Sequence, residues 1–187
     1  MELHKKKTLK HPKADEQKRQ QFLEALNNNL SKNKPIIYLD ESGFKSHDCR
    51  TYGYALKGKA CMGQYNWQLK NHTNAIGAIY EGKLFAVNLF DSTINSDVFH
   101  YWVKNTLLPE LPANSVIVMD NATFHKRVDT KELLENNRHT ILWLPPYSPD
   151  LNPIEKVWAW IKQKRKLWRL DCVFTLFQRF LSDCASF

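Results

Sequence analysis

Short apolar runs separated by polar turns fill the chain from residue 35 onward, and this pattern predicts a mixed α/β domain. Strands are expected at residues 35–39, 51–56, 73–80, 83–90, 115–119 and 140–144. Helices are expected at 14–30, from Asn95 or Ser96 to Pro109 and Pro112, between Asp120 and Glu135, and at 153–168 and 173–181. Antiparallel strands followed by alternating helices and strands make a mixed sheet covered by helices.

The first 34 residues differ from the rest because basic residues gather there. We expect residues 1–34 to form a basic N-terminal arm with a leading helix, and residues 35–187 to form the main domain. The arm is a candidate for contact with DNA phosphates, although a solvated charged helix is the commoner explanation. The basic residues that cluster there are Lys5, Lys6, Lys7, Lys10, Lys13, Lys18 and Arg19.

Composition narrows the classes of protein to which the chain can belong. A net charge of +8 and a pI of about 9.3 favour an anionic partner, and nucleic acid is the usual one. No apolar run reaches 18 residues and no secretory signal opens the chain, so we expect a cytoplasmic protein without a membrane span. The four cysteines form no CxxC pair and complete no zinc pattern.

Two apolar runs end in an aspartate, IIYLD at Asp40 and VIVMD at Asp120. A carboxylate at the carboxyl end of a buried strand lies at the rim of the sheet, where ligands bind in α/β folds. Two such carboxylates close together repel each other, and a divalent cation such as Mg²⁺ removes that repulsion. Each aspartate taken alone is more simply explained as the start of a turn.

Glu155 opens the helix of the NPIE segment. Asn152 suits the helix N-cap and Pro153 the first helical position, so Glu155 is suited to reach back to the cap in a capping box. The side chain also lies at the edge of the helix's apolar face, beside the small Ala159, from where it could reach a metal at the sheet rim. These two uses compete for the same oxygens.

The same helix continues with a dense run of basic residues and three tryptophans. Cations just beyond a carboxylate site suit a phosphate backbone that crosses it, whereas a solvated helix face is the simpler explanation of any single lysine. The basic residues are Lys162, Lys164, Arg165, Lys166 and Arg169, and the tryptophans are Trp158, Trp160 and Trp168.

Three sequence blocks resemble the catalytic core of DDE transposases, within them the bacterial insertion-sequence transposases of the mariner superfamily. The blocks are IIYLDESGF, VIVMDNATFH and LPPYSPDLNPIEKVWAWIK, and the resemblance runs from about Pro35 to about Trp168. Thirty-four residues separate Asp120 from Glu155, a spacing characteristic of that superfamily. The YSPDLNPIE block is the most specific signal.

The resemblance implies an RNase H-like fold, a mixed five-stranded sheet flanked by helices in which the first and fourth strands are adjacent. It implies that Asp40, Asp120 and Glu155 are catalytic and bind the metal, which is expected to be two Mg²⁺ ions with Mn²⁺ as a substitute. The implied activity is metal-dependent DNA strand cleavage and strand transfer in the transposition of an insertion sequence.

The resemblance also assigns supporting roles to Glu41, Asn121 and His125, with a plain structural histidine as an equal alternative for His125. It implies DNA as the partner, as transposon ends and target, and a homodimer in a bacterial, nucleoid-associated setting. Only about 34 residues precede the first strand, too few for the helix-turn-helix region of relatives. We therefore expect a separately encoded helix-turn-helix half, or its loss.

Three other functions stay open at the level of sequence. The first is an inactive or domesticated transposase remnant that acts as a DNA-binding protein. The second is an RNase H-like nuclease that acts on RNA–DNA hybrids, against which the LPPYSPDLNPIE block argues. The third is an ordinary basic α/β domain in which the acidic residues only start turns and cap helices.

Overall fold

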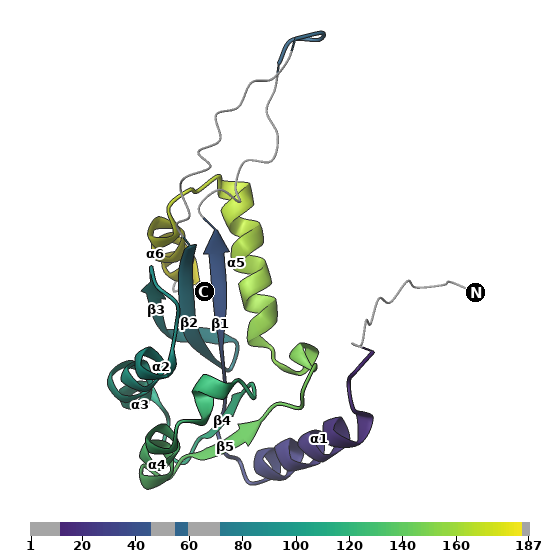
Figure 1. Ribbon diagram of the computed structural model, residues 1–187, viewed down its shortest axis with the longest axis vertical. Helices are drawn as coiled ribbons and strands as arrows, with labels where there is room; N and C mark the ends of the chain where they lie inside the picture. Colours follow the sequence, from purple (N-terminus) through teal and green to yellow (C-terminus); the bar gives the residue numbers. More distant parts are fainter. Residues whose placement is uncertain (1–11, 46–54, 60–71, 185–187) are drawn as a thin grey trace, which may run out of the picture.

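A single mixed sheet organises the computed structural model, which describes residues 12–45, 55–59 and 72–184. Its strand order is β3-β2-β1-β4-β5, with β1–β2 and β2–β3 antiparallel and β1–β4 and β4–β5 parallel (Figure 1). The strands are β1 Ile36–Lys45, β2 His72–Tyr80, β3 Lys83–Phe90, β4 Val116–Met119 and β5 Thr140–Trp143. The expected fold, including the adjacent first and fourth strands, is confirmed.

Helices cover both faces of this sheet. The α-helices are α1 Glu16–Ser31, α2 Ser96–Trp102, α3 Leu108–Glu110, α4 Val128–Asn136, α5 Ile154–Trp168 and α6 Val173–Cys184. A π-helix, η1 Val103–Leu107, joins α2 to α3, and short 3₁₀ turns lie at η2 Thr123–Lys126 and η3 Pro149–Leu151. In the described ranges no helix combines the length and the apolar character needed to cross a membrane.

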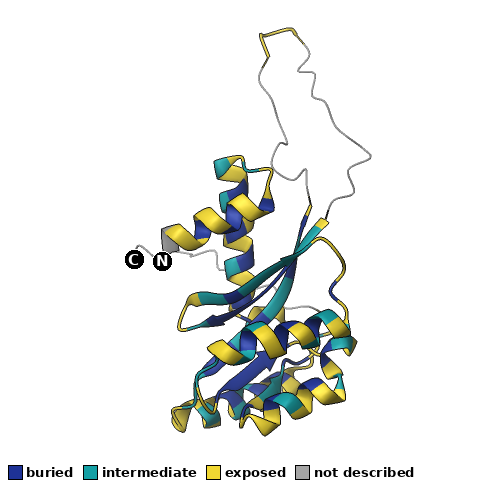
Figure 2. Ribbon diagram, turned by 90° about the vertical axis from the view of Figure 1, so that its left-hand side faces the viewer, coloured by how far each residue is buried: buried dark blue, intermediate teal, exposed yellow. Residues whose placement is uncertain are grey.

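The alternation of side chains along the strands divides the core into clusters. Ile37 and Leu39 of β1 face one cluster with α2, η1 and α4, whereas Phe44 packs with α5 and α6 on the other face. A third cluster joins Phe22 of α1 to Val116 of β4. Figure 2 shows the buried residues concentrated along the strands and the inner sides of the helices.

The first strand is longer than its apolar run, so the prediction that it ends before Asp40 is wrong. β1 continues through the polar residues to Lys45 because β2 pairs with it over that whole length, as far as Lys45↔His72. The predicted strand at 51–56 lies mostly outside the described residues, and the described Ala55 and Leu56 belong to no strand.

The predicted hairpin and the start of the next helix are both confirmed. Glu81 and Gly82 join β2 to β3 with φ values of 48° and 79°, the pair of positive values that a tight hairpin turn needs. Asn95 caps α2 by accepting hydrogen bonds from Asp97 N and Val98 N, both at 3.0 Å. Pro109 does not end the helical segment, which passes through it to Glu110.

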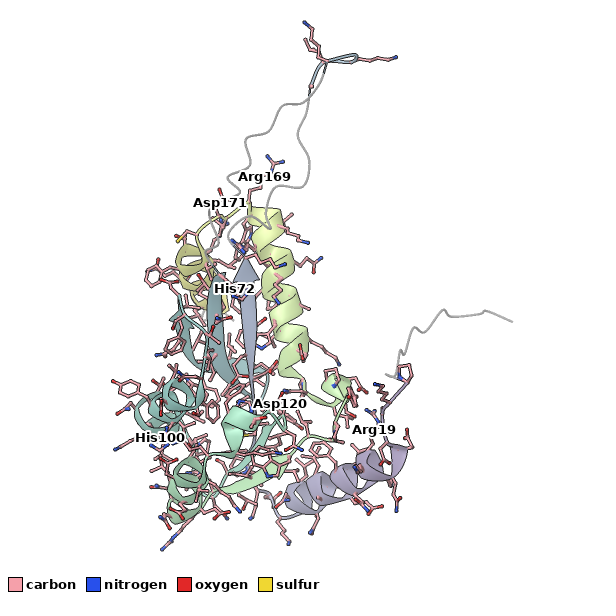
Figure 3. The ribbon with its side chains drawn as sticks, viewed as in Figure 1. Arg19, His72, His100, Asp120, Arg169 and Asp171 are labelled. Carbon is pink, nitrogen blue, oxygen red and sulfur yellow. The ribbon has the colours of Figure 1, made fainter. Side chains whose placement is uncertain are left out.

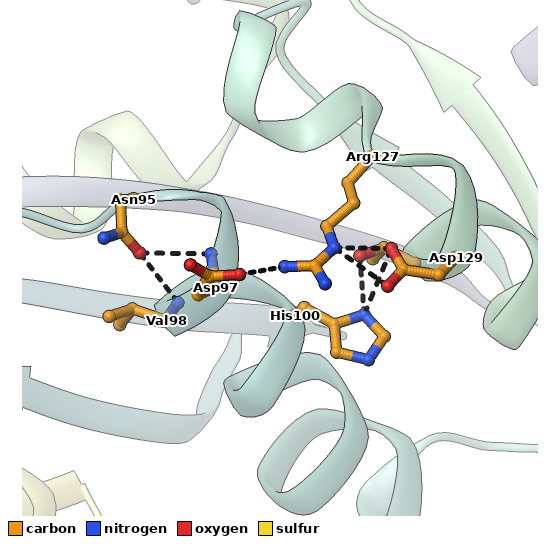
Figure 4. Close-up of polar contacts among 7 residues, drawn as sticks. Asn95, Asp97, Val98, His100, Arg127 and Asp129 are labelled. Carbon is orange, nitrogen blue, oxygen red and sulfur yellow. Dashed lines mark hydrogen bonds and ion pairs between the residues drawn. The ribbon is translucent and has the colours of Figure 1, made fainter.

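A polar clamp holds the start of α4 against the start of α2 (Figure 4). The Arg127 guanidinium binds Asp97 at the start of α2, and its Nε donates to Asp129 of α4 at 2.7 and 2.8 Å. His100 of α2 hydrogen-bonds Thr130 of α4, with 2.8 Å between Nδ1 and Oγ1. The clamp therefore fixes the position of η2, the turn immediately before Arg127.

The leading helix α1 is tied to the loop before α5 by a bidentate ion pair. Arg19, labelled in Figure 3, donates from Nη1 and Nη2 to the two carboxylate oxygens of Asp150 at 2.9 and 2.8 Å. The Arg19 side chain is only 7% exposed, whereas that of Asp150 is 40% exposed, so the pair is only partly shielded from the solvent screening that weakens surface pairs. Asp150 lies in η3, four residues before α5 begins.

Arg165 stabilises the other end of α5 from inside the protein. Arg165 is 2% exposed, and its guanidinium donates to Lys45 O at 2.7 Å, Leu170 O at 3.0 Å and Asp171 O at 2.8 Å. It thus joins the end of β1 to the turn between α5 and α6. The interpretation of Arg165 as part of an exposed basic face is therefore wrong.

We expect Arg165→Met to lower the free energy of unfolding by about 2–4 kcal/mol, because buried carbonyl groups then lose their charged donor. Lys166→Met is the matched control, since Lys166 is exposed in the next position of α5, and should change stability by about 0.5 kcal/mol or less. Urea denaturation of both variants measures the difference. Equal stability of the two variants would contradict the role of Arg165.

Candidate active site

Asp40, Asp120 and Glu155 line one open cavity of about 410 Å³. They come from the middle of β1, the residue after β4 and the first turn of α5. The remaining wall is formed by the loop before α5 and the segment after Asp120. These other lining residues are Asn121, Ala122, Leu144, Pro145, Pro146, Tyr147, Ser148, Pro149 and Asn152.

Strand register explains why the two aspartates meet. The parallel ladder between β1 and β4 ends at the pair Tyr38↔Val118. Asp40 and Asp120 each lie two residues beyond that last pair, so the same register carries both carboxylates to the point where the strands separate. Asp40 stays in the sheet because it is paired with Gly77 of β2 on its other side.

Asp40 and Glu41 are consecutive but belong to opposite faces of the sheet. Asp40 lies four residues before Phe44 in β1, so both side chains point to the same face of the sheet. Phe44 packs there in the cluster with α5 and α6, and Asp40 therefore faces the helix that carries Glu155. Glu41 lies two residues after Leu39, so both side chains point to the other face, where η2 lies. One strand therefore supplies acidic groups to two different environments.

His125 connects these two acidic environments. Its ring is buried, with 2.8 Å from Nε2 to Glu41 Oε1 and 2.7 Å from Nδ1 to Asp120 Oδ1. The rings of Phe99 and Phe124 pack against it at centroid distances of 4.3 and 4.2 Å. His125 thereby holds one oxygen of Asp120 in place, and Ala122 N donates to the same oxygen at 3.0 Å.

Helix α5 approaches the sheet closely at the position opposite Asp40. A Cβ on Gly77 would lie 3.2 Å from the ring of Trp158, so glycine there leaves room for the tryptophan. Trp158, Ile154 and Ile161 are buried and form the predicted apolar face of the helix. This packing brings the exposed Glu155 in the first turn to the cavity.

Of the two competing uses of Glu155, the capping box with Asn152 does not form. No side chain caps the start of α5. Asn152 uses its side chain elsewhere, donating from Nδ2 to Leu39 O of β1 at 3.2 Å. Neither oxygen of the Glu155 carboxylate is therefore used as a cap, which leaves the carboxylate to the cavity.

Burial and neighbouring charge act together on Asp40. Desolvation, then the charges of Glu155 and Glu41, raise the pKa of Asp40 from 3.8 to about 8. Burial also raises the pKa of Glu155, against the opposing effect of Lys162. The cavity thus carries an acid that is costly to ionise unless a positive charge enters.

The pKa of Asp120 is lowered and that of His125 is raised, because the two side chains are hydrogen-bonded to each other. The hydrogen bond from His125 lowers the pKa of Asp120, whose side chain is 52% exposed. Burial on its own would lower the pKa of His125, but its bonds to Asp120 and Glu41 outweigh this effect and raise the pKa to about 9. Both shifts favour the charged forms, a protonated His125 ring beside an ionised Asp120.

The donor set suits a hard divalent cation. Mg²⁺ takes one or two carboxylates and completes its shell with water and phosphate oxygens, as an open cavity permits. Among the described residues no group of three or more Asp, Glu, His or Cys side chains is arranged to hold a metal ion, and this includes the three carboxylates of the cavity. An ion here would therefore need ligands from solvent or substrate.

The basic residues of α5 are divided between different environments. Lys162 lies over the Phe44 ring at 5.4 Å, and Lys164 lies over the Trp160 and Trp168 rings, each at 5.5 Å. Lys166 and Arg169 are exposed. Figure 3 shows Arg169 at the end of α5 that lies far from Asp120. The 15 residues of α5 span about 22 Å at 1.5 Å each.

Sequence reasoning missed the contribution of the loop before α5 and of Asn152. Tyr147, 51% exposed, lies in the cavity wall with a φ of 56°, an uncommon value for an aromatic residue. Nothing in the hydrophobic pattern marks such a conformation, although the prolines around it indicate an ordered loop. The position of Asn152 before Pro153 marks it in the sequence, but this pattern predicts a helix cap and not the bond to Leu39 O.

Comparison with known proteins gives both a family and a set of similar folds. The family model described as DDE superfamily endonuclease matches residues 35–176, more than half of the chain. An uncharacterised protein of Sinorhizobium fredii, y4pE/y4sA, is 30% identical over 74 residues, which cover 40% of this chain and 50% of that protein.

The similar solved structures include several of the Mos1 transposase. The Mos1 transposase paired-end complex with left transposon end gives a TM-score of 0.70 at 17% identity, covering 97% of this chain and 58% of that chain. The catalytic domain of Mos1 mariner transposase gives 0.66 at 16% identity, covering 94% and 84%. At this identity the likeness concerns the fold, and the chain spans little more than half of the longer Mos1 chain.

We expect Asp40→Asn to stabilise the metal-free protein increasingly between pH 4 and pH 8. Below its ordinary value of 3.8 the aspartate is protonated in both states, whereas at higher pH only the unfolded state ionises freely until the folded pKa of about 8 is reached. Each pH unit in that window favours unfolding of the wild type by about 1.4 kcal/mol at most. Urea denaturation in EDTA at several pH values measures this.

Glu132→Gln provides the control for this titration, because Glu132 is exposed on α4. Its stability difference from the wild type should stay flat over the same range. A flat difference for Asp40→Asn as well would show that Asp40 ionises normally in the folded protein.

Proposed function

Since the chain belongs to the DDE superfamily endonucleases, we propose that it is the catalytic domain of a DNA transposase. In this proposal it cleaves strands at the ends of an insertion sequence and joins the freed 3′ ends to target DNA. The observation that supports it most directly is the convergence of Asp40, Asp120 and Glu155 on one open cavity from three separate elements. The absence of a side-chain cap on α5 removes the simplest structural use of Glu155.

Within this proposal Asp40, Asp120 and Glu155 are the metal ligands. Together the three carboxylates would hold two Mg²⁺ ions, with Mn²⁺ as a substitute. Bound there, the ions would supply activation of the attacking oxygen and stabilisation of the leaving one. Two Mos1 mariner paired-end complexes of similar fold are described as containing Mn and Mg, respectively.

The protein's own groups prepare this chemistry. His125 and Ala122 N fix Asp120 through Oδ1, so the other carboxylate oxygen is left for the cavity. Glu41 holds the far side of the His125 ring. Asn121, exposed and in the cavity wall, is placed to contact the substrate. We propose supporting roles for Glu41, Asn121 and His125 on this basis.

We propose that the DNA backbone runs from the cavity along α5. The exposed cations Lys162, Lys166 and Arg169 follow the carboxylates along the helix, and about 22 Å of helix corresponds to roughly six or seven base pairs at 3.4 Å each. The basic arm at residues 1–34 would add contacts to phosphate, and its α1 is joined to the cavity loop through Arg19 and Asp150.

The proposed assembly is a homodimer that acts with a DNA-reading helix-turn-helix half. The Mos1 neighbours are described as paired-end complexes and a strand transfer complex, which fits an enzyme that holds two DNA ends. Relatives that the chain resembles act as dimers and carry a DNA-reading region. Light scattering of this chain with and without such a half and a DNA end tests the assembly.

Purified protein should nick supercoiled plasmid in the presence of Mg²⁺ or Mn²⁺ but not in EDTA. Asp40→Asn, Asp120→Asn and Glu155→Gln should each lower the rate by at least about 100-fold, the scale of losing a transition-state stabilising group. Glu132→Gln, on α4, should nick at the wild-type rate. Circular dichroism confirms that each variant is folded.

Nicking that survives in all three folded variants would overturn the assignment of the site. No nicking by any protein, even with the helix-turn-helix half supplied, would favour an inactive remnant that binds DNA. Cleavage of an RNA–DNA hybrid without cleavage of duplex DNA would favour a hybrid nuclease instead.

The double variant Lys166→Gln, Arg169→Asn should weaken DNA binding and reduce its dependence on salt. Asparagine keeps the positive φ of 54° at position 169 accessible. Losing two phosphate contacts lowers the slope of log affinity against log salt by about 1.8 for duplex DNA. Lys83→Gln, Lys104→Gln removes the same charge from exposed positions on β3 and η1 and should leave the slope unchanged.

A further inference from the structure

Asn152 forms hydrogen bonds with both of the elements that carry Asp40 and Glu155. Its Nδ2 donates to Leu39 O, the carbonyl immediately before Asp40, at 3.2 Å. Its own carbonyl oxygen accepts from Glu155 N, also at 3.2 Å. One residue therefore contacts the backbone beside both carboxylates, while itself lining the cavity.

The bond from Asn152 to Leu39 O lies where the pairing between β1 and β4 ends. β4 pairs with β1 only as far as Tyr38, so Leu39 lies one residue beyond that pairing. The amide of Asn152 supplies a donor to the Leu39 carbonyl where the neighbouring strand no longer extends. The first turn of α5 is thus attached to β1 at the place where the cavity opens.

Asn152 occupies this place at an energetic cost. It is 3% exposed, and its Oδ1 is buried without a hydrogen-bond partner among the described residues. A buried acceptor left unsatisfied destabilises the folded state. The side chain does not cap α5, so stabilisation of the helix end does not explain why an amide is present.

We infer that Asn152 is a positioning residue that fixes the separation of Asp40 and Glu155 and thereby sets the affinity of the cavity for a divalent cation. This inference rests on the proposed function, because it takes the carboxylates as metal ligands. The role of Asn152 is to orient ligands from outside the ion's coordination shell, as hydrogen-bond partners of metal ligands do. Loss of such partners weakens metal binding by about 10- to 100-fold.

The test compares Asn152→Leu with wild type by measuring Mn²⁺ binding to the full chain without DNA. Leucine has the same branched arrangement of four side-chain heavy atoms but cannot donate to Leu39 O. We expect the dissociation constant for Mn²⁺, followed by electron paramagnetic resonance of the free ion, to rise at least about 10-fold. The Mg²⁺ concentration for half-maximal plasmid nicking should rise by the same factor, with the rate at saturating metal reduced less.

Asn29→Leu is the matched control, because Asn29 also donates Nδ2 to a backbone carbonyl, that of Ala25 at 2.8 Å, but lies in α1. It should leave the Mn²⁺ affinity unchanged. Thermal unfolding of each variant in EDTA reports folding separately from metal binding. Should Asn152→Leu fail to fold, Asn152→Ala replaces it in the same comparison.

The outcomes separate this inference from the function on which it rests. Mn²⁺ binding that is lost in Asp40→Asn but unchanged in a folded Asn152 variant would overturn the role of Asn152 and leave the metal site standing. Wild-type binding that does not depend on Asp40 would overturn the metal site and the inference together. Weaker binding by Asn152→Leu, with Asn29→Leu unchanged, supports both.

Discussion

The parallel pairing of β1 with β4 is the constraint on which the site depends. It ends at Tyr38↔Val118, and the same register carries Asp40 and Asp120 past its end to the same point of the sheet. Antiparallel pairing of β1 with β2 then holds Asp40 in a regular strand, opposite a glycine that admits Trp158 of α5. The third carboxylate arrives because α5 packs on that face.

Around this arrangement the protein uses polar contacts to fix positions that hydrophobic packing alone leaves undefined. The Arg127 clamp fixes the turn that carries His125, and His125 in turn holds Asp120 and Glu41. Arg19 and Asp150 tie α1 to the loop before α5. Apart from the local bond between Arg127 and Asp129, these contacts join different elements, and together they fix the segments that border the cavity.

Much of this architecture could be predicted from the sequence, because buried strands and the face of α5 have clear apolar patterns. The length of β1 could not, since its second half is polar and is kept in the sheet by pairing with β2. The roles of Arg165 and Asn152 were also missed. A basic residue in a basic run, or an asparagine before a helix, has the same local sequence whether it is exposed or buried against a distant strand.

The two hydrogen bonds that Asp120 Oδ1 accepts have a consequence for the choice of ion. With that oxygen occupied, the carboxylate presents a single oxygen to the cavity and is poorly suited to bidentate coordination. Ca²⁺ is larger and commonly takes both oxygens of a carboxylate, whereas Mg²⁺ requires a compact octahedral shell with single-oxygen contacts. In the proposed metal site, the anchoring of Asp120 would therefore favour Mg²⁺ over Ca²⁺, because it leaves one carboxylate oxygen for coordination.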